Sequence, residues 1–292
     1  MKKIAFATAE KIKALSPDDR LVIPLLAENQ IQVLPAVWSD DNVNWQAFDA
    51  VIIRSCWDYH LKPQQFRDWI DHVTAPGVPL WNPPELLNWN SDKRYLKSLA
   101  EKEIPIVPTA WQERAGVFDV KGVMQASGWQ KAVVKPVVSA SAHQTYSVAL
   151  DDEENIFNDI AGDIRAGGLF MIQEFMDRVV EEGEWSLMFF GGQFSHAVLK
   201  TPKSGDFRVQ EEFGGITTTP VPPPHILAGA RAILAAVSSP ILYARVDGID
   251  TGEQFILMEL ELIEPFLFLE KSPSAPANFK DAIINLAMTT DT

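Results

Sequence analysis

Two apolar stretches near the end of the chain carry acidic residues inside a strand-like pattern, and this feature restricts the fold more than any other. Asp247 lies in the first stretch, and Glu259 and Glu261 lie in the second. Residues two apart on a β-strand face the same side, so the two glutamates share a face. A carboxylate that faces inward is costly to bury unless a cation or a hydrogen-bond donor satisfies it. The stretches therefore predict a β-hairpin with carboxylates collected on one face.

These three carboxylates are candidate metal ligands. Hard oxygen ligands without a nearby histidine or cysteine suit Mg²⁺ or Mn²⁺ better than Zn²⁺. The alternative is that the acids belong to a solvated strand face, which is the commoner outcome for paired acids taken alone. The remainder of the sequence has to distinguish the two interpretations.

The composition is that of a globular protein. The chain has 292 residues, of which 47% are hydrophobic, and this is enough for two or three packed units. A net charge of -14 argues against a nucleic-acid partner, because phosphate backbones require basic surfaces. We also expect no membrane partner, since no uncharged run is long and apolar enough to cross a bilayer.

The cysteine and histidine content excludes two kinds of site. The single cysteine, Cys56, excludes an internal disulfide and favours a reducing, cytoplasmic location. The five histidines are scattered and show no zinc-binding spacing. We therefore expect no histidine-centred or cysteine-centred chemistry.

Residues 1–88 alternate short apolar strands with helical patterns, which predicts a small parallel sheet covered by helices. Ligands bind at the carboxyl ends of the strands in such sheets. One strand is followed directly by Arg54, Trp57, Asp58 and Tyr59. We expect these residues to bind the organic substrate, with Arg54 pairing a carboxylate and Asp58 an amine. An amphipathic loop without a binding role is an equally weighted alternative.

A second, β-rich region follows a proline-rich hinge. Ser91 or Asp92 is expected to cap a helix that contains Lys93. Lys135 ends an apolar strand, and the small-residue loop after it contains Ser139 and Ser141. A lysine in that position can bind a phosphate, and small residues let backbone N–H groups approach the anion. Alone, the pattern equally describes a solvent-facing lysine at a strand end.

A further apolar strand is interrupted by Glu174, which is followed by Phe175 and Met176. Adenine requires apolar walls, an acceptor for its amine and a backbone donor for its ring nitrogen, and these residues could supply all three. Glu184, ten residues further on, could accept hydrogen bonds from a ribose. Taken alone, Glu174 is as well explained as an exposed strand residue.

The order of these parts resembles the ATP-grasp superfamily, in particular the glutathione synthetase-like branch and enzymes of the O-ureido-serine cyclo-ligase type. The resemblance covers essentially the whole chain, and its most specific parts are RVDG followed by ELE, and VVKP followed by QEF. It implies a mixed α/β (α+β) fold. A pre-ATP-grasp domain would occupy 1–88 and the ATP-grasp domain 89–292, with a β-rich lid subdomain at about 115–177.

The resemblance also implies residue roles. Lys93 and Lys135 would bind phosphates, aided by Ser139 and Ser141; Glu174, Phe175 and Met176 would bind adenine, and Glu184 the ribose; Arg245, Lys200 and Arg208 would be catalytic; Asp247, Glu259 and Glu261 would bind Mg²⁺. Two positions depart from the family pattern. Glu261 replaces the usual asparagine ligand, and the usual glycine-rich lid loop is serine-rich here.

The implied function is an ATP- and Mg²⁺-dependent ligase that joins a carboxylate to an amine or another nucleophile through an acyl-phosphate. The substrate would be small and amino-acid-like, and Mn²⁺ could replace Mg²⁺. Alternatives are an intramolecular cyclo-ligase, a phosphotransferase and an ATP-binding module without catalysis. Dimers are common in the family, so a homodimer is compatible with the resemblance.

Overall fold

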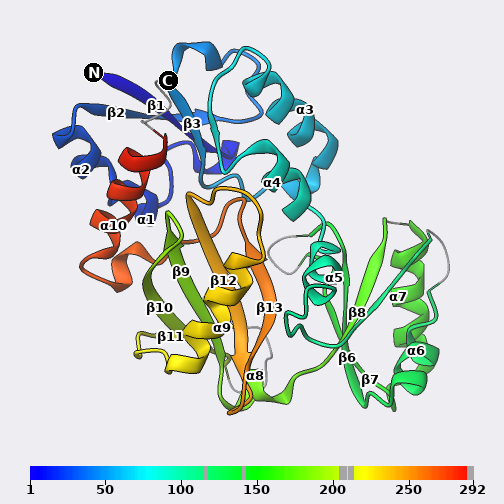
Figure 1. Ribbon diagram of the computed structural model, residues 1–292. Coiled ribbons are helices and arrows are strands. Elements are labelled where there is room, and N and C mark those ends of the chain that lie inside the picture. Colours follow the sequence, from blue (N-terminus) through cyan, green and yellow to red (C-terminus); the bar gives the residue numbers. More distant parts are fainter. Residues whose placement is uncertain (115–117, 140–142, 167, 204–208, 210–213, 288–292) are drawn as a thin grey trace.

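The computed structural model describes residues 1–114, 118–139, 143–166, 168–203, 209 and 214–287. Three β-sheets organise these residues, and helices cover their outer faces (Figure 1). The mixed α/β (α+β) architecture confirms the fold class expected from the sequence.

The first sheet is parallel and belongs to the N-terminal part of the chain. In the order β2-β1-β3-β4 it contains β1 (Lys2–Thr8), β2 (Ile31–Val37), β3 (Ala50–Ile53) and β4 (Leu80–Trp81). Alternate residues of β1 pack in two different hydrophobic cores, because successive side chains on a strand point to opposite faces. Ala5 and Ala7 face the helix α3 (Pro63–Thr74), whereas Ile4 and Phe6 face the other side.

The second face of this sheet is covered by chain segments from both ends of the sequence. They are the N-terminal helices α1 (Pro17–Arg20) and α2 (Ile23–Glu28), and the C-terminal helix α10 (Ala275–Ala282). Phe279 of α10 shares a core with Ile4 and Phe6, and Figure 1 shows α10 beside α2. The predicted 1–88 unit therefore packs against the C-terminal end of the chain.

The second sheet is antiparallel and contains the predicted acidic hairpin. In the order β11-β10-β9-β12-β13 it contains β9 (Glu184–Phe190), β10 (Gln193–Thr201), β11 (Ile216–Thr218), β12 (Tyr243–Asp250) and β13 (Phe255–Glu261). The helix α9 (Pro224–Ala235) packs on its apolar face. Gly248 is required in β12, because a Cβ there would lie 2.4 Å from the Ile256 carbonyl oxygen.

The third sheet is a smaller antiparallel one. In the order β5-β8-β6-β7 it contains β5 (Thr109–Trp111), β6 (Lys131–Pro136), β7 (Tyr146–Ala149) and β8 (Phe170–Glu174). The helices α6 (Val120–Ser127) and α7 (Glu154–Ala166) cover one of its faces. The lid subdomain expected at about 115–177 would include β6, β7, β8, α6 and α7 of this unit, whereas β5 lies before that boundary.

Shorter elements connect the sheets. They are α4 (Pro84–Asn90), α5 (Tyr95–Ala100), α8 (Asp177–Glu181), the 3-10 turns Glu10–Ile12, Trp45–Ala47, Tyr59–Leu61 and Leu269–Lys271, and the π turn Ile283–Ala287. The expectation that Lys93 lies within a helix is wrong, since it falls between α4 and α5. Asp92 accepts a hydrogen bond from the Arg94 N–H, and this local bond competes with helix continuation. Within the described residues, no helix has the length and apolar character needed to cross a membrane.

Candidate active site

A cavity of about 520 Å³ lies where the second and third sheets face each other. Most of the residues singled out in the sequence line it. They are Trp57, Tyr59, Lys93, Lys135, Ser139, Glu174, Phe175, Met176, Glu184, Lys200, Arg245, Asp247, Glu259 and Glu261. Arg54 and Asp58 do not line the cavity, and Ser141 and Arg208 lie outside the described residues.

The strand register of the second sheet sets charged side chains opposite one another. Arg245 on β12 pairs with Glu261 on β13, and Asp247 pairs with Glu259. On the two strands beside β12 in the same sheet, Lys200 of β10 lies opposite Glu184 of β9. Residues directly opposite on neighbouring strands have Cβ atoms about 5 Å apart, so these side chains can interact.

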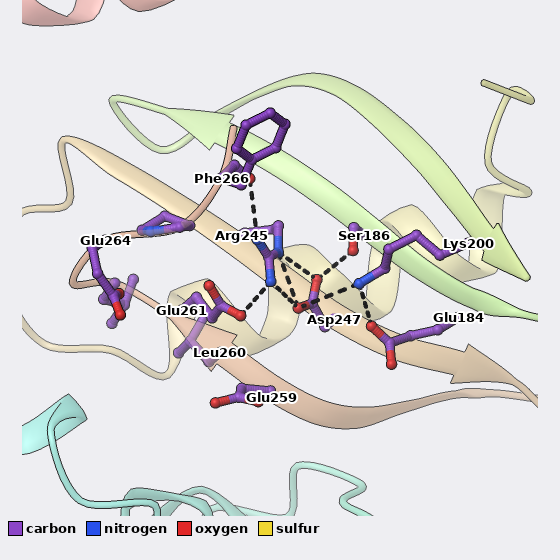
Figure 2. A network of polar contacts seen from close by, with 12 residues as sticks. Glu184, Ser186, Lys200, Arg245, Asp247, Glu259, Leu260, Glu261, Glu264 and Phe266 are labelled. Carbon is purple, nitrogen blue, oxygen red and sulfur yellow. Dashed lines mark hydrogen bonds and ion pairs between the residues drawn. The ribbon is translucent and has the colours of Figure 1, made fainter. Parts of the chain in front are cut away.

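Asp247 is the centre of the resulting polar network (Figure 2). Its carboxylate accepts hydrogen bonds from the Arg245 guanidinium at 2.9–3.0 Å and from the Ser186 hydroxyl at 2.5 Å. Lys200 lies 3.9 Å from the same carboxylate and donates to Glu184 at 2.5 Å. Arg245 also donates to Glu261.

The charges of this network are unevenly balanced. Burial alone would raise the pKa of Asp247, but Arg245 and Lys200 outweigh it and hold that pKa below its ordinary value. Burial raises the pKa of Glu261 to about 8; Arg245 opposes this shift, and the carboxylates of Asp247 and Glu259 add to it. At Glu261 the neighbouring cations therefore do not offset burial and the repulsion between the acids, and the charged form of this carboxylate is disfavoured.

The three predicted metal ligands are each held by a cation in this structure. Glu259 accepts a hydrogen bond from Lys93, and Arg245 binds both Asp247 and Glu261. Over the described part of the chain, no three acidic, histidine or cysteine side chains already converge as metal ligands would. The donors nevertheless fit a hard divalent cation, because they are all oxygens and a bound cation would stabilise the charged form of these crowded acids.

The opposite wall of the cavity supplies a lysine and an apolar surface. Among the described residues, Lys135 has no ion-pair partner, and burial lowers its pKa to about 8. Glu174, Phe175 and Met176 line the same end. The Phe175 N–H already donates to the Lys131 carbonyl, so of the two predicted backbone donors Met176 is the one placed to meet a ligand.

The predicted role of Arg54 is not supported by its position. Arg54 is 2% exposed, and it donates to Asp19 at 2.8 Å and to the Pro265 carbonyl at 2.9 Å. Its guanidinium also lies 4.9 Å from the centre of the Tyr243 ring. The chain that follows β13 covers this end of the parallel sheet, so Arg54 is enclosed in the core instead of facing a crevice.

Asp58 is engaged in a similar way. Its carboxylate accepts a hydrogen bond from the Trp38 indole at 2.7 Å. Trp57 and Tyr59, from the same turn, do line the cavity. The turn after β3 therefore contributes two aromatic side chains to the wall of the site. Its charged residues, Arg54 and Asp58, instead form hydrogen bonds with other parts of the fold.

A segment that sequence reasoning missed forms the remaining wall. This is 262–268, which directly follows β13 and has no regular secondary structure. Every backbone carbonyl in it lies within hydrogen-bond distance of a side-chain donor from elsewhere in the chain. The pairs are Leu262 with Asn82 (2.7 Å), Ile263 with Tyr243 (2.8 Å), Glu264 with Trp57 (3.1 Å), Pro265 with Arg54 (2.9 Å), Phe266 with Arg245 (3.1 Å), and Leu267 and Phe268 with His196 (3.0 Å each).

This anchoring fixes the path of 262–268 without a sheet or helix. The Nε2 atom of His196 faces two carbonyls, so it carries the ring proton, and burial lowers the pKa of the imidazole. The anchored side chains of Ile263, Glu264, Phe266 and Phe268 line the cavity. The only sequence signal for this wall is Glu264, a third acid in the run that begins at Glu259.

Comparisons with known proteins agree with this architecture. Residues 4–82 match the family described as the N-terminal domain of D-cycloserine synthetase DcsG. The cycloserine biosynthesis protein DcsG of Streptomyces lavendulae is 28% identical over 264 residues, which cover 84% of this chain and 86% of that protein.

Solved structures are similar over nearly the whole chain. The crystal structure of D-cycloserine synthetase DcsG matches with a TM-score of 0.85 at 25% identity, covering 98% of this chain and 99% of that one. A D-alanine–D-alanine ligase from Bacillus anthracis matches with a TM-score of 0.72 at 15% identity, covering 99% of this chain and 98% of that one. The second likeness concerns the fold alone.

Proposed function

Because the chain belongs to the ATP-grasp superfamily, we propose that it is an ATP- and Mg²⁺-dependent ligase that joins a carboxylate to a nitrogen nucleophile. The observation that carries this proposal is the composition of one cavity wall. Lys93, Lys200 and Arg245 lie there beside Asp247, Glu259 and Glu261, while Lys135 faces them from the third sheet. Cations and carboxylates together suit a triphosphate bound with a divalent metal ion.

The nucleotide would lie between the second and third sheets. Lys135 and Lys93 would bind its phosphates, and Ser139 would add a hydroxyl donor. Glu174 and the Met176 N–H would contact the two polar edges of adenine, with Phe175 and Val179 beside it. Glu184, which Lys200 already holds, would accept from the ribose.

The first chemical step would be transfer of the γ-phosphoryl group. A substrate carboxylate oxygen forms a bond to the γ-phosphorus as the bond from that phosphorus to the bridging oxygen breaks, and ADP leaves. The product is an acyl-phosphate. Lys200 and Arg245 would stabilise the charge that develops during this transfer, so the contribution of the protein is positioning and electrostatics.

The second step would form the new bond to carbon. The nucleophile nitrogen attacks the acyl carbon and loses a proton, and inorganic phosphate departs as the tetrahedral intermediate collapses. The oxyanion of that intermediate would be stabilised by Arg245, whose hydrogen bond to the Phe266 carbonyl helps to fix its orientation. No side-chain nucleophile is needed in either step.

Asp247, Glu259 and Glu261 would hold the Mg²⁺ that accompanies the nucleotide. When bound, the metal would neutralise part of the negative charge of the phosphates. Each of these acids is bound to a cation here, so Lys93 and Arg245 would have to exchange their carboxylate contacts for phosphate contacts when the nucleotide enters. These lysine and arginine side chains thus keep the acids paired in the free protein.

Ring closure within one substrate is a specific form of this reaction. It is favoured by the similarity to D-cycloserine synthetase, which extends over 84% of the chain. In that form the carboxylate and the nucleophile nitrogen belong to the same amino-acid-like molecule, and the cavity would hold it in a folded conformation.

The proposal is tested by supplying ATP, Mg²⁺ and a library of amino acids that includes O-ureido-serine. A ligase yields ADP and a condensed or cyclised product by mass spectrometry, a phosphotransferase yields a stable phosphate ester, and a binding module yields neither. Replacing Arg245 with Met should abolish ADP release, while replacing the exposed Lys102 with Met should not. ADP release that survives in the Arg245 variant would contradict the assigned site.

A further inference from the structure

We propose that Glu264 binds the amine of the substrate and selects amino acids over carboxylic acids that lack it. This inference rests on the proposed ligase function and concerns the end of the cavity away from the adenine. Arg54 and Asp58, the charged residues that the sequence suggested for substrate recognition, are both used by the fold. The substrate end therefore needs a different polar group.

Glu264 is such a group. The residue is 9% exposed and lines the cavity. Among the described residues, its carboxylate has no ion-pair partner and accepts no hydrogen bond from another side chain, which distinguishes it from Asp247, Glu259 and Glu261; it accepts one from its own backbone N–H. Figure 2 shows its side chain apart from the network around Asp247. A buried carboxylate without a cationic partner is costly, and a bound cation offsets that cost.

The surroundings of Glu264 favour an organic ammonium ion over a metal. Trp57 and Phe266 flank the residue in the cavity wall, and their ring centres lie 6.4 Å apart. Phe268 continues this aromatic surface, packing edge-on against Phe266. Aromatic faces attract ammonium groups, whereas Mg²⁺ retains water and requires oxygen ligands around it.

The backbone holds Glu264 in place before any ligand binds. Its carbonyl accepts from the Trp57 indole, and the next carbonyl, that of Pro265, accepts from Arg54. Arg54 is in turn held by Asp19. The carboxylate therefore projects from an anchored segment, as specific recognition of a small polar group requires.

The position also fits the chemistry of the reaction. Arg245 binds the Phe266 carbonyl, two residues from Glu264, and lies where the acyl group would react. A substrate whose carboxylate meets Arg245 could thus place an α-amine at Glu264, because the amine and the carboxyl group of an α-amino acid are bonded to the same carbon. This arrangement links recognition of the amine to activation of the carboxylate.

The test compares matched pairs of probes. Each amino acid that releases ADP from the wild type is paired with the same acid lacking its amine, and KM and kcat are measured for both. The wild type should prefer the amine by at least tenfold in kcat/KM. Glu264→Gln and Glu264→Ala should raise KM for the amine-bearing probe at least tenfold and abolish the preference, while the Kd for ATP stays within twofold of the wild type.

Glu270→Gln is the matched control, because Glu270 is an exposed acid of the same part of the chain. It should behave as the wild type. If the Glu264 variants keep the preference for the amine, or instead change the Mg²⁺ dependence of ADP release, the assignment is overturned while the ligase function stands. If the wild type neither binds ATP nor releases ADP with any probe, the proposed function fails, and the assignment fails with it.

Discussion

Lys135 differs from the other lysines of the cavity because it lacks a carboxylate partner among the described residues. Lys93 binds Glu259 and Lys200 binds Glu184, so their charges are already balanced. Burial without a partner lowers the pKa of Lys135 to about 8. A single residue is thereby made sensitive to pH in the range where enzymes are usually assayed.

We expect ATP affinity to depend on this lysine and on pH. Below about pH 8 the free protein carries a protonated Lys135 that can bind a phosphate, and above that pH the proton is lost. Affinity measured by calorimetry should therefore fall between about pH 7 and 9. Lys135→Arg should flatten this dependence, and Lys135→Ala should cost about 1.5–3 kcal/mol of binding free energy at pH 7. Equal affinities for wild type and Lys135→Ala would exclude a phosphate contact.

The burial of Asp18 should make the unfolding free energy depend on pH. One of its oxygens accepts from the Glu270 N–H, and the other is buried without a partner. Burial, together with the neighbouring Asp19, raises the pKa of Asp18 to about 6. The folded state then holds a proton that the unfolded state releases near pH 4, so the unfolding free energy falls as the pH rises from about 4 to 6 and stays lower above that range.

Asp18→Asn should remove this loss while keeping the bond to Glu270. At pH 7 the variant should be more stable than the wild type by up to about 3 kcal/mol, because the pKa of Asp18 is higher in the folded than in the unfolded chain. Denaturant unfolding at several pH values measures the difference. Asp41→Asn, at an exposed position, is the control. The gain in unfolding free energy of the variant over the wild type should be larger at pH 7 than at pH 4. An equal gain at both pH values would show that the buried Asp18 carboxylate does not destabilise the folded protein.

Two asparagine side chains bind the backbone of the second sheet, one where β12 begins and β13 ends, the other along the edge strand β13. Asn82 accepts from the Leu242 N–H and donates to the carbonyls of Tyr243 and Leu262. Asn90 donates to the Leu260 carbonyl and accepts from the Leu262 N–H. Edge strands expose unpaired backbone groups, and here amide side chains satisfy them.

Asn82→Ala should therefore destabilise the protein by more than about 2 kcal/mol, because it leaves three buried backbone groups without their partner. Equilibrium denaturation is the measurement. Asn29→Ala is the matched control, since Asn29 makes a single exposed hydrogen bond to the Leu25 carbonyl. Similar losses in both variants would mean that the Asn82 contacts contribute little.

The sequence predicted the elements better than it predicted the orientation of their side chains. The strands 131–136, 184–190, 193–201 and 243–250 follow from apolar runs, because a strand pattern depends on neighbouring residues only. Lys93 was expected within a helix, and local bonds of Asp92 interrupt that helix. The enclosure of Arg54 by Asp19 and Pro265 depends on chain far away in sequence, so no local pattern could indicate it.

At the scale of the whole molecule, the site is assembled from three sheets and the segment after β13. The cavity joins strands of the second and third sheets with a turn of the first, and the C-terminal helix α10 packs against the N-terminal sheet. A ligand in this cavity would therefore contact strands of the second and third sheets and the turn after β3 of the first. Its binding should stabilise the chain as a unit.

ATP with Mg²⁺ should raise the midpoint of thermal unfolding. At a concentration 100 times the Kd, a ligand that binds only the folded state adds about 2.7 kcal/mol. Removing Mg²⁺ with a chelator should reduce the gain, since the acids of the hairpin would then face the phosphates directly. Glu259→Gln should lose the Mg²⁺-dependent part of the shift and keep the folded midpoint without ligand. A shift that is independent of Mg²⁺ would argue against a metal at Asp247, Glu259 and Glu261.

The anchoring of 262–268 has a consequence for how such enzymes diverge. Its donors, from Asn82 to His196, bind backbone carbonyls, and nearly every residue type presents the same carbonyl. Mutation can thus alter Ile263, Glu264 or Phe266 without removing a single contact that sets the path of the chain. We expect this wall of the cavity to accept new side chains, and with them new substrates, while the scaffold around it stays unchanged.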